Sequence, residues 1–204
     1  MTSETLTHSI GQRFLLWIDD VGGYLVSRNE SFTIGRSGVH ATSDVPINGD
    51  LASEHITIQS GSDYCVLTPH AKTLVNSLEV EEPLAIVTGD ILTMGSVQLE
   101  VQPRHPLSQT LGLRITSHHN SYGAKNILLM KRSIILGSKR QNHIVLGNGH
   151  EDTVIYESSE SKRLLFKPTA PIRVGEQSAT DDSELSNGSC LESGDLTITV
   201  ESLD

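Results

Sequence analysis

Short apolar segments, each bounded by turn residues, follow one another along the whole chain. Typical examples are RFLLWI (13–18), SFTIGR (31–36), YCVLTP (64–69) and TVIYES (153–158), which are rich in β-branched and aromatic residues. No segment has the sustained three-and-four spacing of a surface helix. The pattern predicts an all-β chain. Strands this short favour a sandwich of antiparallel sheets, because antiparallel neighbours need only a tight turn between them.

Length and composition limit the class of protein. The 204 residues have room for one large β domain or two of about 100 residues, and the formal charge is -10. No apolar run reaches the roughly 20 residues of a membrane span, and MTSETLTHSI lacks the basic and apolar parts of a signal peptide. A cytoplasmic protein is therefore expected. Cys65 and Cys190 are far apart in sequence, so inert thiols are favoured over a disulfide framework or a zinc site.

An internal repeat divides the chain in two. SFTIGRSGVHATSDVPINGD and SIILGSKRQNHIVLGNGHED share an apolar strand closed by Gly, a loop, a second strand and Asn-Gly, and a Gly-Asp turn follows in each half. The three landmarks recur at offsets of 102, 100 and 105 residues: Gly35 and Gly137, Asn48-Gly49 and Asn148-Gly149, Gly89-Asp90 and Gly194-Asp195. We predict two copies of one domain, residues 1–103 and 104–204, joined near QPRHPLSQ, where prolines interrupt strand pairing.

The order of motifs in the first copy resembles the forkhead-associated (FHA) domain over about residues 11–102. Strand-Gly-Arg is followed by His before a strand, Asn after a hairpin and a Gly-Asp turn with a later Gly. The resemblance implies a sandwich of two antiparallel sheets whose loops at one end bind a phosphothreonine peptide. It also implies that the Arg contacts phosphate, the His braces its loop and the Asn supports the contact loops. The matching residues, expected to shape these loops around Arg36, are Gly35, His55, Asn76, Gly89 and Asp90.

Two departures from the family pattern concern the phosphate site itself. Ala52 stands where the family has a phosphate-binding Ser, and Ala71 stands where it has a peptide-gripping Asn. Each lost charge-assisted bond is worth about 1.5 to 3 kcal/mol. The candidate phosphopeptide-binding residues that remain are Arg36, Ser37, Ser53, His70 and Lys72. The alternative for Arg36 is a structural role, in which it braces a loop by pairing with Asp44 or Asp50.

The second copy departs further from the family. Gly137-Ser138 replaces Gly-Arg, and no His precedes TVIYES. Lys139-Arg140 follows directly. A role as solvated turn residues is favoured for this pair over a basic phosphate-binding site shifted along the chain from the family position. Residues 1–102 hold four Lys or Arg against thirteen Asp or Glu, a balance of -9, while the rest holds eleven against twelve, a balance of -1. An acidic first copy repels phosphate, and halves of unequal charge favour self-association.

No other chemistry is indicated. The adjacent His118 and His119 lack metal-ligand spacing, and no nucleophile elbow or phosphate-cradling Gly loop is present, so neither a metal, a cofactor nor an enzyme activity is predicted. An acidic chain with 4% aromatic residues does not suit nucleic acid, and no membrane partner is expected. Two hypotheses remain open for a non-catalytic protein-protein interaction module. One is recognition of phosphothreonine segments through the first copy, and the other is a phosphate-independent scaffold or self-association module.

Overall fold

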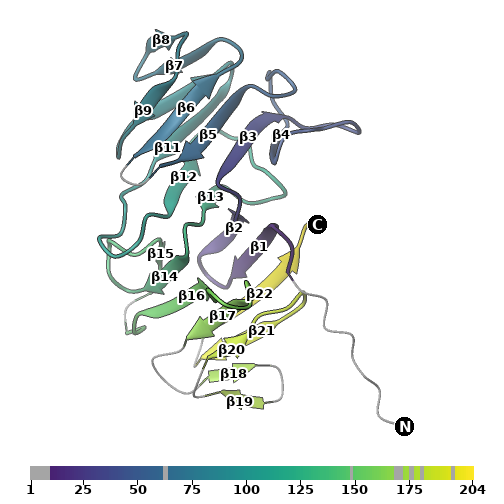
Figure 1. The fold of residues 1–204 in the computed structure, drawn as a ribbon, viewed down its shortest axis with the longest axis vertical. Helices are drawn as coiled ribbons and strands as arrows, with labels where there is room; N and C mark the ends of the chain where they lie inside the picture. Colours follow the sequence, from purple (N-terminus) through teal and green to yellow (C-terminus); the bar gives the residue numbers. More distant parts are fainter. Residues whose placement is uncertain are drawn as a thin grey trace.

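The computed structural model describes residues 10–61, 64–147, 149–167, 172–174, 177–179, 182–193 and 196–204, which form twenty-two strands and no helix (Figure 1). The first eleven strands are β1 (Arg13–Ile18), β2 (Gly22–Ser27), β3 (Ser31–Arg36), β4 (Val45–Ile47), β5 (Ile56–Ser60), β6 (Cys65–Pro69), β7 (Thr73–Val75), β8 (Leu78–Val80), β9 (Leu84–Ile86), β10 (Ile91–Met94) and β11 (Val97–Val101). The second eleven are β12 (Leu111–Ile115), β13 (Asn126–Leu129), β14 (Ser133–Gly137), β15 (Ile144–Val145), β16 (Thr153–Glu157), β17 (Leu164–Lys167), β18 (Ile172–Val174), β19 (Gln177–Ala179), β20 (Ser183–Glu184), β21 (Cys190–Ser193) and β22 (Leu196–Ser202).

Three sheets make up the molecule. Two five-stranded sheets, β4-β3-β5-β6-β9 and β15-β14-β16-β17-β20, have the same strand order at an offset of eleven strands. A twelve-stranded sheet, β19-β18-β21-β22-β1-β2-β13-β12-β11-β10-β7-β8, runs through the whole molecule. Each five-stranded sheet packs on part of the long sheet around its own hydrophobic core. The all-β sandwich class is therefore confirmed. Among the described residues, no helix is present that could span a membrane.

The long sheet is continuous because two hairpins have exchanged places. The β1-β2 hairpin pairs with β22, from the end of the chain, and the β12-β13 hairpin pairs with β11. The two hairpins then join through a parallel pairing of β2 with β13, for example Leu25 opposite Ile127. The domain boundary between residues 103 and 104 remains a prediction, because strands from each half of the sequence pair with strands of the other half.

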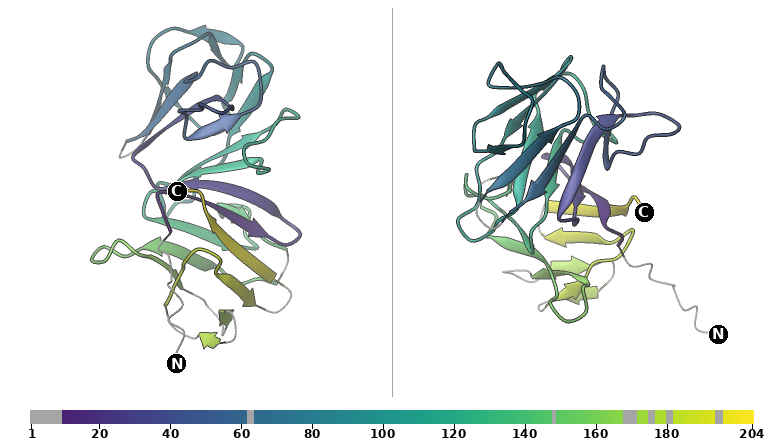
Figure 2. Two further views of the ribbon diagram at one scale, coloured as in Figure 1. Left: turned by 90° about the vertical axis from the view of Figure 1, so that its right-hand side faces the viewer. Right: turned by 45° about the horizontal axis from the view of Figure 1, so that its top comes forward.

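The exchanged strand β1 is buried on both faces. Along β1, Leu15 belongs to the core under the first five-stranded sheet, whereas Phe14 and Leu16 belong to the core under the second. Because successive side chains of a strand point to opposite faces, the two five-stranded sheets must cover opposite faces of the long sheet. Figure 2 shows this strand between the upper and lower parts of the molecule. Burial on both faces explains why RFLLWI is a continuous apolar run.

The two cysteines lie in different settings. Cys65 is buried in the first core, and Cys190 is half-buried at the start of β21. Both are free thiols. Burial raises the pKa of the Cys65 thiol, which keeps it in its unreactive protonated form.

His143 lies in the loop before β15, close to His105, with 5.6 Å between their ring centroids. Its Nδ1 accepts a hydrogen bond from the Ile135 N–H at 2.9 Å. Burial, followed by the effect of His105, lowers the pKa of His143 from 6.5 to about 4. Between these two pH values the unfolded chain binds a proton that the folded chain does not bind. The stability contributed by the neutral ring is thus full above pH 6.5 and is lost as the pH falls towards 4.

We expect the free energy of unfolding to drop by about 2 kcal/mol between pH 6.5 and roughly pH 4.5 through His143 alone. The substitution His143→Asn keeps an acceptor for the Ile135 N–H and removes the titration, so this part of the pH dependence disappears. Urea unfolding of both proteins across this pH range measures it. His118→Asn, at an exposed histidine, is the control and leaves the dependence in place. An unchanged pH dependence in His143→Asn contradicts the assignment.

Candidate functional site

Arg36 ends β3 at the rim of the first sandwich with its side chain exposed. Its backbone N–H donates to the Ala52 carbonyl at 2.8 Å, which fixes the start of the side chain. Within the described residues, the guanidinium has no hydrogen-bond or ion-pair partner. The alternative of a brace to Asp44 is wrong, because that carboxylate accepts instead from the N–H and hydroxyl of Thr33. Asp50, the other carboxylate considered, does not pair with Arg36 either.

Gly35 is required for close approach rather than for a turn. A Cβ at this position would lie 2.0 Å from the Ser53 carbonyl oxygen and 3.0 Å from the Ala52 oxygen. The residue makes no turn, because it remains inside β3. Its missing side chain lets the β4–β5 loop run directly over the strand next to Arg36.

His55 connects three segments around this rim. It is 5% exposed, and its Nε2 donates to the Lys72 carbonyl at 2.9 Å, so Nδ1 is the atom that accepts from the Ala52 N–H at 3.1 Å. Its backbone N–H donates to Ile34 in β3, and its carbonyl accepts from the His70 N–H. One buried residue, through its side chain and its backbone, thus holds the β4–β5 loop, the β6–β7 loop and the end of β3 together.

Ala52 and Ala71, which stand where the family has Ser and Asn, can offer only backbone groups to a ligand. Ala52 and Ala71 are half-buried, and their methyl groups cannot donate to an anion. Ser37 follows Arg36 in the chain, and its N–H donates to the Ile47 carbonyl. Ser53 is exposed and lies in the β4–β5 loop, which runs against Gly35. Among the candidate residues in the described part of the chain, Arg36 is the one whose positive charge has no carboxylate partner, since Lys72 pairs with Glu79.

His70 and Lys72 face a different neighbourhood from Arg36. They line a shallow depression of about 300 Å³ together with Glu79 and Glu81, and neither Arg36 nor Ser53 lines it. The Lys72 ammonium lies 3.3 Å from a Glu79 carboxylate oxygen. The His70 ring bonds the Thr57 hydroxyl at 2.7 Å. Their polar groups are already engaged, which weakens the expectation that they assist Arg36.

Asn76 and the Gly-Asp turn lie at the far end of β7 from Lys72. Asn76, with φ of 51°, begins the two-residue turn between β7 and β8. Its side-chain amide donates to Asp90 Oδ1 at 2.8 Å, and its Oδ1 accepts from the Ile91 N–H. Asp90 Oδ2 in turn accepts from the Val87 N–H, and Gly89 has φ of 89°. These residues tie two turns together, and no hydrogen bond among the described residues joins Asn76 to the loops around Arg36.

The corresponding rim of the second sandwich carries different groups. Ser138 follows Gly137 where Arg36 follows Gly35, and Lys139 forms an ion pair with Asp152. This pairing and a hydrogen bond from Asn142 lower the pKa of the Asp152 carboxyl. Asn148 and the turn Gly194-Asp195 lie outside the described residues. Lys139 is therefore neutralised, while Arg140 turns towards a pocket between the sandwiches.

His118 and His119 lie in the loop between β12 and β13, with ring centroids 3.8 Å apart. The planes of the two rings are tilted by 36°. Nδ1 of His119 bonds the Ser117 hydroxyl at 2.9 Å. No group of three or more His, Cys, Asp or Glu residues in the described ranges is arranged to hold a metal ion.

No protein-family model matches the chain, and no curated protein matches it. Solved structures do match, and the following three are structures of FHA domains. The FHA domain of Rv0020c is 26% identical, with 46% of this chain and 95% of that chain covered and a TM-score of 0.33. A structure described as an analysis of phosphothreonine-dependent FHA domain interactions is 26% identical, with coverage of 47% and 99% and a TM-score of 0.35. The N-terminal FHA domain of EssC, from the bacterial type VII secretion apparatus, is 13% identical, with coverage of 94% and 93% and a TM-score of 0.26.

Proposed function

We propose that the protein is a non-catalytic interaction module of the FHA type, built from two FHA-like copies, and that it binds a phosphothreonine segment of a partner protein through Arg36. The observation that carries the proposal is the exposed guanidinium of Arg36, which has a fixed backbone and no partner among the described residues. A planar guanidinium donates two parallel hydrogen bonds to a phosphate, which a lysine cannot do.

The loops around Arg36 are already held in place by hydrogen bonds, as is typical of a binding surface. Buried His55 holds the surrounding loops by five hydrogen bonds to backbone groups of other residues, so they lose little conformational freedom when a peptide binds. The acidic charge of residues 1–102 opposes a dianionic phosphate, and Ala52 and Ala71 offer no side-chain donor. The expected affinity is therefore modest, and most of the phosphate dependence comes from one residue.

We expect a phosphothreonine peptide library to yield binders whose affinity falls at least tenfold in Arg36→Ala and falls partly in Arg36→Lys, since lysine keeps the charge but not the fork. Fluorescence anisotropy with each phosphorylated peptide and its unphosphorylated twin measures this. Arg163→Ala removes another exposed arginine, one that pairs with Glu184 in the second sandwich, and serves as the control for loss of charge. Equal binding of the phosphorylated and unphosphorylated peptides would exclude phosphate recognition.

A phosphate-independent scaffold is the second candidate. It is favoured by the methyl groups of Ala52 and Ala71 and by the ion pair that holds Lys72 against Glu79. In a scaffold, partner binding or self-association survives both Arg36→Ala and phosphatase treatment. Light scattering over a concentration series, together with partner capture before and after phosphatase treatment, separates the two candidates. A monomer at every concentration that captures no partner would count against the scaffold.

A further inference from the structure

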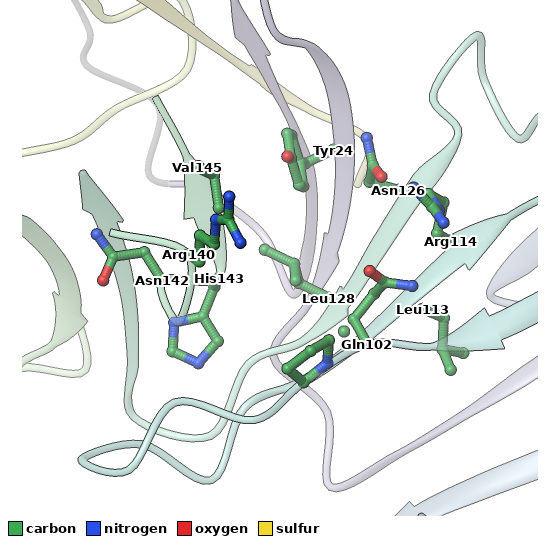
Figure 3. A pocket seen from close by; sticks show the side chains of 12 residues that line it. Tyr24, Gln102, Leu113, Arg114, Asn126, Leu128, Arg140, Asn142, His143 and Val145 are labelled. Atoms are coloured by element: carbon green, nitrogen blue, oxygen red, sulfur yellow. The ribbon is translucent and has the colours of Figure 1, made fainter. Parts of the chain in front are cut away.

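A pocket of about 180 Å³ lies where the β14–β15 loop approaches the exchanged strands of the long sheet (Figure 3). Four segments far apart in sequence form its walls: β2, the stretch from β11 to β12, β13, and residues 140–145. Figure 3 shows Arg140 on one side and Arg114, Asn126 and Gln102 on the other, with Tyr24 and Leu128 between them. The pocket therefore depends on the hairpin exchange, and it is separate from the rim around Arg36.

Tyr24 places an unused polar group in the wall of this pocket. The residue is 8% exposed, and its hydroxyl has no hydrogen-bond partner in the described part of the chain. Burial raises the pKa of this phenol, so the hydroxyl keeps its proton and can donate it in a hydrogen bond. The hydroxyl is not among the fully buried side-chain atoms that lack a partner, so it reaches the space of the pocket, where a bound ligand can accept its hydrogen bond.

The charge of the lining favours an anion. Of the twelve lining residues, two are arginines and none is Asp or Glu, although the chain as a whole carries -10. Arg114 pairs with Glu100, a neighbour outside the lining, at 2.5 Å. The guanidinium of Arg140 has no partner within the ranges that the structure describes, so its charge is available. One free guanidinium and one free phenol thus face the same space.

The rest of the lining is apolar and limits the ligand's size. Leu113, Leu128, Val145 and Pro103 supply hydrocarbon surface. A Cβ on Gly112 would come within 3.1 Å of the Gln102 side chain, so the glycine leaves this part of the wall open. The volume slightly exceeds an engineered cavity of about 150 Å³ that admits benzene, and it is below the 300 Å³ or more of drug-sized pockets.

We propose that this pocket binds a small organic anion, a carboxylate or phosphate carried on a short apolar or aromatic body, with Arg140 pairing with the charge and Tyr24 donating a hydrogen bond. The ligand is either a free metabolite or a side chain of a partner protein, because both present the same chemistry.

Phenyl phosphate and benzoate are suitable probes, with benzyl alcohol as their uncharged counterpart. Titration calorimetry and NMR chemical shifts on the full chain are expected to show that the anions bind and that benzyl alcohol binds at least tenfold more weakly. Arg140→Gln lowers anion affinity about tenfold, and Tyr24→Phe lowers it about threefold while removing a hydroxyl that makes no hydrogen bond to any described residue. Arg163→Gln leaves the affinity unchanged, and chemical-shift changes confined to the residues that line the pocket separate this site from the proposed phosphothreonine site around Arg36.

A Gly-Ser peptide that contains phosphotyrosine carries the same phenyl phosphate group. It distinguishes a partner side chain from a free metabolite as the source of the ligand. Binding of the peptide as tightly as phenyl phosphate supports a partner side chain, and binding of the free anion alone supports a metabolite. The proposal is overturned if none of the anions binds. It is also overturned if benzyl alcohol binds equally well, or if Arg140→Gln, folded as judged by its NMR spectrum, retains full affinity.

Discussion

Neither half of the chain is expected to fold when residues 1–103 and 104–204 are produced separately. Each fragment should give the collapsed amide spectrum of an unfolded chain or should aggregate. The same two fragments produced together should form a folded one-to-one complex. The prediction follows from the exchanged hairpins, because each hydrophobic core is completed by strands from the other half of the sequence.

Among the described residues, six buried side chains from each half of the sequence belong to the hydrophobic core of the other half. The first core takes Leu111, Leu113, Ile115, Ala124, Ile127 and Leu129 from the second half, and the second core takes Ile10, Phe14, Leu16, Ile18, Tyr24 and Val26 from the first. Burying one such large apolar side chain is worth about 1.5 to 3 kcal/mol, so each set contributes about 10 kcal/mol or more. That loss is comparable to the entire stability of a typical domain, about 5 to 15 kcal/mol.

Size-exclusion chromatography and heteronuclear NMR of the two fragments, alone and mixed, provide the measurement. The mixed sample is the control, because it contains the same break in the chain and regains the missing strands. A well-dispersed spectrum and a cooperative urea transition for residues 1–103 alone would contradict the prediction. That result would mean that the β1-β2 hairpin folds back to pair with β11 within its own half.

Most strand positions could be predicted from the sequence, because a strand is indicated by the apolar residues within the segment itself and by the turn residues that flank it. RFLLWI coincides with β1 and SFTIGR with β3. Strands that the pattern did not indicate, such as β8 and β20, are two or three residues long. Such short pieces owe their extended form to a neighbouring strand rather than to their own composition.

The partner of each strand could not be predicted in the same way. Alternation indicates which face of a strand is buried, but it does not indicate which strand lies beside it. A signal for the exchange was nonetheless present, since RFLLWI and GYLVS are apolar without alternation, as strands covered on both faces are. In SFTIGR, which lies in a five-stranded sheet, burial alternates from Ser31 to Ile34.

The site was predictable only as far as its motif is local. The pairing of Gly35 with an exposed Arg36 is a short-range feature, and the structure places both at the rim. Whether Lys72 assists Arg36 depends on Glu79, which lies on a neighbouring strand and captures the ammonium. The pocket that Tyr24 and Arg140 share could not be found from the sequence, because its walls meet only after the hairpins exchange.

Gly35→Ala is expected to destabilise the protein by about 3 kcal/mol or more and to remove the binding surface at the rim. The added methyl carbon would lie 2.0 Å from the Ser53 carbonyl oxygen and 2.6 Å from its carbon, both of which are backbone atoms. A flexible side chain could move aside, but this backbone segment is held by the bond between the Arg36 N–H and the Ala52 carbonyl. The loop must shift, which breaks that bond and loosens the connection to His55.

Gly38→Ala is the matched control for Gly35→Ala. Gly38 lies two residues beyond Arg36 in the β3–β4 loop, where an added Cβ meets nothing within 4 Å. Urea denaturation should therefore give a midpoint close to that of the parent for Gly38→Ala and a much lower midpoint for Gly35→Ala. Because the cost depends on close approach of the loop, Gly35→Ala at a temperature where it is still folded should also shift the NMR resonances of Ala52, Ser53 and His55. Parent-like stability in Gly35→Ala would show that the β4–β5 loop does not run against β3, and the fixed rim around Arg36 would then lose its structural basis.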